Sequence, residues 1–159
     1  MSRQSTGLAN DITTLEDRVV TLGTGTTQLD PAKHANRLLQ ISTADAAYTI
    51  NLPYAKGSGD IYEFLLTVAH TSGSIIINAR HPGTTSNKFI GVIRSNHSSG
   101  NIVIHYASTV NDIITLNNTT TGGQRAGDHI KIQDVADATW RMVDAWITSS
   151  GAQATPFSG

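Results

Sequence analysis

From Leu38 onward, nearly every apolar run is short and alternates with polar residues. The run over 47–53 shows this pattern well, because Tyr48, Ile50 and Leu52 fall on one face of a strand. Gly, Asn, Ser, Asp or Pro bound most of these runs, as expected where strands end in turns. The spacing predicts about nine short strands, over 38–42, 47–53, 61–69, 74–79, 88–95, 102–108, 112–118, 129–135 and 139–147. Since no helical segments alternate with them, we expect a mainly β fold, an antiparallel β-sandwich or barrel.

The first 36 residues have a different pattern, which predicts a helix over 8–22 and a linker over 23–36. The helix carries apolar residues spaced by four, three, four and three positions, the a/d stripe of a heptad: Leu8, Ile12, Leu15, Val19 and Leu22. An isolated helix of this length is marginal in water. We therefore expect the stripe to contact a partner or another copy of the chain, the alternative being docking on its own domain. The predicted division is an arm, 1–36, and a β domain, 37–159.

The amino-acid composition argues against several classes of function. The formal net charge is −1 and the pI is about 6.6, so the whole chain offers no electrostatic case for binding nucleic acid or a membrane surface. Only 14% of residues are charged, against an average of about 25%. Cysteine is absent, which excludes disulfides and thiolate metal sites. No apolar run reaches the about 18 residues of a membrane-spanning helix, and residues 1–20 lack the apolar stretch of a signal peptide.

The residue types that carry chemistry do not form a recognisable catalytic or metal-binding motif. The six histidines match no HExxH or HxxxH spacing, although His105 and His129 both lie in predicted strands and could meet in space. The C-terminal acidic residues do not follow the spacing of a calcium loop. There is no GxSxG, and TGGQRAGD lacks the Lys-Ser/Thr ending of a phosphate-binding loop, so it is interpreted as a turn. We therefore expect no enzyme activity, no cofactor and no metal.

Two local features leave alternatives open. Trp140 and Trp146 lie on one face of the last predicted strand, where large aromatic residues usually fill a core. As an exposed pair they would instead bind a sugar, with Tyr54 and the 80–87 loop as further candidates. Gly91 interrupts the predicted strand over 88–95, which indicates a bulge or a close approach of two backbone segments.

Several segments of the β region, in order, resemble the capsid decoration (cement) proteins of tailed bacteriophages: AYTINLP, GDIYEFLLTVAHTSGSIIINA, FIGV and DIITL. The closing segment AGDHIKIQDVADATWRMVDAWITSSGAQATPFSG carries the strongest likeness. The resemblance covers roughly residues 37–159.

The resemblance implies a homotrimeric β domain on the outer surface of an assembled phage head, bridging subunits of the major capsid protein. Many decoration proteins contact the shell through an N-terminal arm, a role that would fall to residues 1–36 here. The expected location is the virion, after synthesis in the host cytoplasm. The alternative expectation is a glycan- or receptor-binding module of a phage tail fibre or spike.

Overall fold

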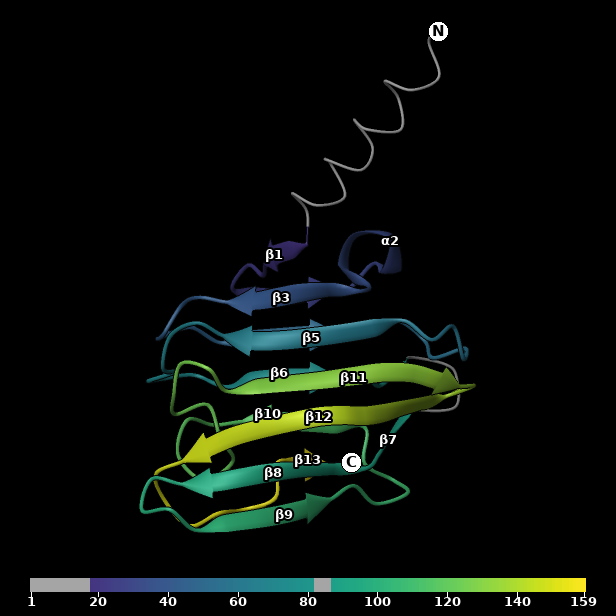
Figure 1. Cartoon of the computed structure of the whole chain (residues 1–159). Helices are drawn as coiled ribbons and strands as arrows, with labels where there is room; N and C mark the ends of the chain where they lie inside the picture. The colour runs from purple at the N-terminus through teal and green to yellow at the C-terminus, as the bar shows by residue number, and fades with distance from the viewer. Residues whose placement is uncertain (1–17, 82–86) are drawn as a thin grey trace, which may run out of the picture.

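The computed structural model describes residues 18–81 and 87–159, which form two β-sheets packed face to face (Figure 1). The larger sheet contains, in spatial order, β1 (Val19–Thr21), β3 (Arg37–Ile41), β5 (Ile61–Leu66), β11 (His129–Ala136), β12 (Thr139–Ser149), β8 (Val92–His97) and β9 (Ile102–Tyr106). A further short strand, β7 (Lys88–Ile90), also pairs with β12. The smaller sheet contains β13 (Phe157–Ser158), β10 (Ile113–Leu116), β6 (Ile75–Asn78), β4 (Tyr48–Asn51) and β2 (Gly25–Gln28). The predicted sandwich is confirmed, and the sheets do not close into a barrel.

The first six strands alternate between the two sheets as the chain advances. Within each sheet they pair in parallel: β3 lies between β1 and β5 and pairs with both, and β4 lies between β2 and β6 and pairs with both. A strand of the opposite sheet makes each crossover, so parallel pairing needs no helix here. The strand pairing is therefore mixed. The sequence had predicted antiparallel pairing, and this part of the prediction is wrong. Antiparallel pairs follow in the second half, among them β5 with β11, β11 with β12, and β8 with β9.

All nine predicted strands are present, and one of them is divided in two. Gly91 separates β7 from β8 at a φ of 108°, and a Cβ there would lie 3.0 Å from Cβ of Met142. The expected close approach at this glycine is confirmed. The strands that the sequence did not predict are β1, β2 and β13, which are too short to show a clear alternation of apolar and polar residues.

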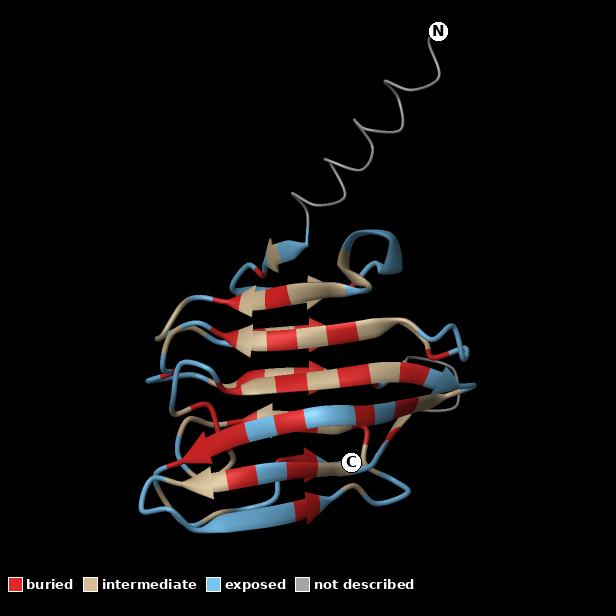
Figure 2. Ribbon diagram, in the orientation of Figure 1, coloured by how far each residue is buried: buried red, intermediate tan, exposed pale blue. Residues whose placement is uncertain are grey.

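The core lies between the sheets and is built from alternate residues of each strand. Figure 2 shows this as buried bands along the central strands, and in β5 the buried residues are Tyr62, Phe64 and Leu66. Trp140 belongs to the core and packs edge-on against Tyr62, with ring centroids 5.6 Å apart. Trp146 lies outside the core on the outer face of the larger sheet.

The helix predicted over 8–22 is wrong for its last residues, and part of the predicted linker is sheet. Val19–Thr21 form β1, which pairs in parallel with β3, and Gly25–Gln28 form β2. The β-branched residues of β1 are poor helix formers that fit a pleated surface, which favours the strand. Residues 31–34 form one short helix, α2 (Pro31–His34), where Asp30 caps the first turn. Leu8, Ile12 and Leu15 lie outside the described residues.

Candidate functional site

The edge of the larger sheet at β9 exposes apolar side chains. Along β9, Ile102, Ile104 and Tyr106 point to the outer face and are 57%, 48% and 73% exposed. Within the described part of the chain, β9 pairs only with β8, so its other side presents unpaired backbone groups. The surface formed by residues 102–106 is called the β9 edge below.

The β9 edge also lies beyond the area that the smaller sheet covers. Val103 faces the inner side of the sheet, as its pairing with the buried Ser95 shows, and yet it is 37% exposed. Figures 1 and 2 show β9 as an exposed strand at the end of the molecule opposite β1. Both faces of this strand therefore hold apolar residues that the described domain leaves uncovered.

The sequence of β9 itself indicates this surface, although the sequence analysis did not identify it. The segment Ile102–Tyr106 reads IVIHY, with apolar residues on both faces, a pattern typical of strands buried on both sides. In a strand at the edge of a sheet, the same pattern indicates a surface that another molecule covers.

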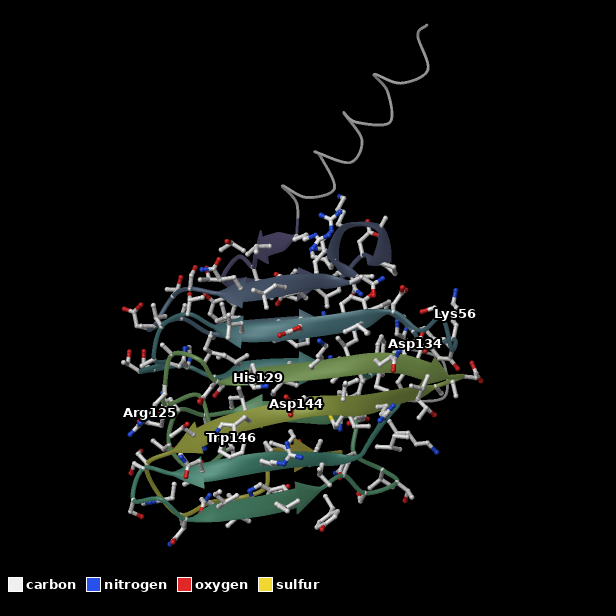
Figure 3. All side chains as sticks on the ribbon, viewed as in Figure 1. Lys56, Arg125, His129, Asp134, Asp144 and Trp146 are labelled. Carbon is white, nitrogen blue, oxygen red and sulfur yellow. The ribbon has the colours of Figure 1, made fainter. Side chains whose placement is uncertain are left out.

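The outer face of the larger sheet carries polar pairs between neighbouring strands, and Figure 3 labels two of the residues involved, His129 and Asp144. Asp144 of β12 contacts Nε2 of His129 at 3.1 Å and Nη1 of Arg94 at 3.2 Å. On β5 and β11, Glu63 and Lys131 are 3.1 Å apart. Because these side chains are partly or half exposed, each pair contributes at most about 1 kcal/mol to folding. The pairs balance the charge of this face, which also exposes the apolar side chains of Val135 and Trp146.

A cavity of about 420 Å³ opens at the end of the sandwich next to α2. Tyr54 and His81 lie at this cavity with their rings perpendicular and 5.8 Å apart, and the side chains of Tyr62 and Trp140 also line it. The structure therefore brings Tyr54 and Trp140 to one site. Trp146 lies elsewhere, on the outer face between His129 and Arg94. Most of the 80–87 loop lies outside the described residues.

Asp134 fixes the loop that forms one wall of this cavity. Its carboxylate accepts hydrogen bonds from the backbone N–H groups of Lys56, Gly57 and Ser58 at 2.9, 2.6 and 3.2 Å, and from the Ser58 hydroxyl at 2.9 Å. Burial alone would raise the pKa of Asp134, but these hydrogen bonds outweigh burial and lower it. The role of Asp134 is structural, since donors of the protein itself already occupy both carboxylate oxygens.

The heptad residues and the two strand histidines singled out from the sequence do not come together. Of the heptad positions, Val19 is 52% exposed on β1, whereas Leu22 is buried in the core and cannot meet a partner directly. His105 is buried on the inner face of β9, while His129 lies on the outer face of β11, so these histidines do not meet. Among the described residues, no three His, Cys, Asp or Glu side chains are grouped in a way that could hold a metal ion.

The buried histidines predict a loss of stability in mild acid. Burial lowers the pKa of both His70 and His105, more than the Thr43 backbone raises that of His70. Below about pH 6.5 the unfolded chain binds protons at these sites that the folded chain does not, so stability falls with pH. We expect the melting temperature to drop between pH 7 and pH 5, and to drop less in a His70→Gln/His105→Gln variant.

The double histidine variant is needed because Asp128 has the opposite effect on stability. Burial raises the pKa of Asp128, despite the hydrogen bonds that its carboxylate accepts from Thr148 and Gly123. Protonation of Asp128 therefore stabilises the folded protein as the pH falls. Thermal unfolding followed by circular dichroism at several pH values measures the difference. Parallel pH profiles of the two proteins would contradict the assignment to histidine.

No protein-family model, curated protein or solved structure matches this chain. Across residues 18–81 and 87–159, the structure contains no helix with the length and apolar character needed to cross a membrane.

Proposed function

We propose that the chain is a structural protein that assembles with copies of itself through the β9 edge and decorates a phage capsid as a trimer. In this role it binds the outer surface of the assembled head and bridges neighbouring subunits of the major capsid protein. The observation that supports assembly is the uncovered, apolar β9 edge. The resemblance of residues 37–159 to decoration proteins supports the capsid as the partner.

The chemistry of the β9 edge favours a second copy of the chain as its occupant. Natural proteins protect exposed sheet edges with charged residues, proline or very short strands. The β9 edge has none of these features, since Ile102–Tyr106 contains no Lys, Arg, Asp, Glu or Pro. By contrast, the opposite edge strand β1 has only three residues. In a closed trimer the β9 edge of each copy would meet a different surface of the next copy, which would supply both backbone hydrogen-bond partners and an apolar cover for Ile102, Ile104 and Tyr106.

Assembly into a trimer would serve capsid decoration through simple binding energetics. Three linked copies bind the shell together, so weak individual contacts add up to strong retention. A protein that binds the assembled lattice and not its free subunits stabilises the lattice by mass action. This role needs no catalytic group. The tail-fibre alternative would use the same oligomer with a different partner, so capsid binding distinguishes the two.

Replacing Ile104 with lysine tests the proposed interface. We expect the wild-type chain to have the mass of three 16.9 kDa copies, about 51 kDa, by size-exclusion chromatography with light scattering. In the Ile104→Lys variant a charge would be buried at the interface, so we expect the mass of a monomer with an unchanged circular dichroism spectrum. Val135→Lys, at an exposed valine of β11, is the matched control and leaves the mass unchanged.

Cosedimentation with capsid shells stripped of their decoration tests the partner. The wild-type chain and the Val135→Lys control are expected to pellet with the shells, and Ile104→Lys to stay in the supernatant. A wild-type monomer, or an Ile104→Lys trimer, would overturn the β9 interface. A trimer that does not pellet with the shells would overturn capsid decoration alone.

A further inference from the structure

The cavity beside α2 has the size and construction of a small-molecule site. Its volume of about 420 Å³ lies within the range of about 300–1,000 Å³ that such sites occupy. Its lining combines aromatic side chains with a few polar ones, and Asp134 holds the Lys56–Ser58 wall in place. The labelled Lys56 and Asp134 mark this end of the molecule in Figure 3.

Two buried side chains that line this cavity carry donors with no hydrogen-bond partner among the described residues. The hydroxyl of Tyr62 and the indole Nε1–H of Trp140 are buried without a hydrogen bond, and the two side chains are 0% and 1% exposed. An unsatisfied buried donor costs about 1–3 kcal/mol, so such groups are expected to meet an acceptor. An acceptor oxygen in the cavity would satisfy them.

The charges around the Tyr62 hydroxyl restrict what that acceptor can be. Burial, and then the negative charges of Asp60, Asp134 and Asp30, raise the pKa of Tyr62, which places acidic groups near the hydroxyl. These acidic groups repel an anion. A simple cation has no oxygen to accept from Tyr62 or Trp140, and Lys56 lines the same cavity. The ligand that fits is neutral and carries oxygens that both accept and donate hydrogen bonds.

The side chains at the cavity suit the two kinds of surface on a sugar ring. Asp60 has carboxylate capacity left for hydroxyl donors, because within the described part of the chain its carboxylate accepts one hydrogen bond, from Asn36, and that bond is 3.4 Å long. Tyr54 supplies an aromatic ring beside these polar groups, against which the C–H face of a sugar can pack.

We propose that this cavity binds one neutral monosaccharide unit of a glycan, with Tyr62 and Trp140 donating to its oxygens and Asp60 accepting from its hydroxyls. The proposal does not rest on capsid decoration or on the β9 interface, since none of the residues that line the cavity belongs to β9. A glycan site would allow a capsid-bound oligomer to attach the particle to a polysaccharide surface. Single-site affinity is expected to be millimolar, with multivalency supplying retention.

The two tryptophans of the chain provide a direct test and an internal control. In a ¹⁵N–¹H spectrum of the full chain, each indole gives one signal, and a Trp146→Phe variant assigns them. We expect titration with D-glucose, D-galactose, D-mannose, L-rhamnose or N-acetyl-D-glucosamine to shift the Trp140 signal saturably, for at least one of the five. The Trp146 signal stays fixed, because that indole lies on the outer face of the larger sheet.

Variants at the cavity test how the sugar is held. Tyr62→Phe removes one oxygen without changing the ring and should weaken binding about five-fold or more, as should Asp60→Asn. Asp144→Asn makes the same atomic change as Asp60→Asn on the outer face of the larger sheet and should leave binding unchanged. Circular dichroism confirms that each variant folds.

The outcomes that would overturn the proposal are specific. A Trp140 signal that does not move at about 50 mM of any of the five sugars would show that none of them binds in the cavity. An equal response to sorbitol would show a non-specific solvent effect. A saturable shift with sodium sulfate would assign the cavity to anions instead. A sugar response that persists unchanged in both Tyr62→Phe and Asp60→Asn would place the binding site elsewhere.

Discussion

Gly122→Ala is expected to destabilise the protein by about 3–6 kcal/mol, the largest effect of a single methyl group that we expect here. Gly122 lies in the loop between β10 and β11 at a φ of 98°, a conformation that L-residues rarely adopt. A Cβ at this position would lie 2.7 Å from Cβ and 2.8 Å from Cδ1 of Ile147. Ile147 is fully buried on β12, between β11 and β8, so it has little room to move.

Gly100→Ala separates the two contributions to this effect. Gly100 lies in the turn between β8 and β9 at the same φ of 98°, but nothing lies within 4 Å of its Cβ position. Its replacement therefore costs backbone strain alone, about 1–3 kcal/mol. For a chain of this size each kcal/mol lowers the melting temperature by about 2–4 °C. We expect Gly122→Ala to melt at least about 5 °C below Gly100→Ala, and equal melting temperatures would contradict the packing argument.

The sequence predicted the central strands well because each buries one face. In β5 and β11, alternate residues enter the core, so the two-residue period is visible without any structure. The same reasoning identified Gly91, because an interior glycine in a strand signals a close approach. It also interpreted TGGQRAGD as a turn, which the structure places between β10 and β11.

The sequence did not predict the N-terminal strands, because two patterns compete there. Val19 and Leu22 continue a heptad spacing, yet β1 forms because the edge of β3 supplies a row of backbone partners. Leu22 then points into the core, and its backbone N–H donates to the carbonyl of Gln40 at 2.9 Å. A tertiary contact of this kind leaves no local signal. The winding of β1 to β6 between the sheets is equally invisible to a local pattern, since it depends on which strands pair.

The candidate sites depend on long-range geometry to different degrees. The apolar run at Ile102–Tyr106 is visible in the sequence, but its place at a sheet edge is not. The cavity joins Tyr54, Tyr62 and Trp140 from three separate segments. The sequence offered Tyr54 and Trp140 as candidates for a sugar site. It gave no reason to separate them from Trp146, because alternation places Trp140 and Trp146 on one face. The structure separates them, since the pairing of β11 with β12 shifts register near Lys131 and Ile132.

Asp134→Asn is expected to cost about 2–4 kcal/mol at pH 7, because one carboxylate holds the whole Lys56–Ser58 wall. An asparagine side chain keeps one acceptor oxygen but turns an NH₂ group toward N–H donors, so at least one buried donor loses its partner. Chemical denaturation followed by fluorescence measures the change. Asp144→Asn is the matched control on β12, where a half-exposed carboxylate contacts Arg94 and His129 and contributes at most about 1 kcal/mol.

The pH dependence of the stability difference between wild type and Asp134→Asn tests whether the carboxylate charge is its cause. The pKa of Asp134 is lowered in the folded protein, so its contribution is complete above the ordinary aspartate pKa of about 3.9 and is lost as the pH falls through the lowered value. The asparagine variant cannot titrate at this position. The stability gap between wild type and Asp134→Asn should therefore be constant from pH 8 to pH 5 and should narrow below about pH 4. A gap that stays constant to pH 3 would show that shape, and not the carboxylate charge, holds the wall of the cavity.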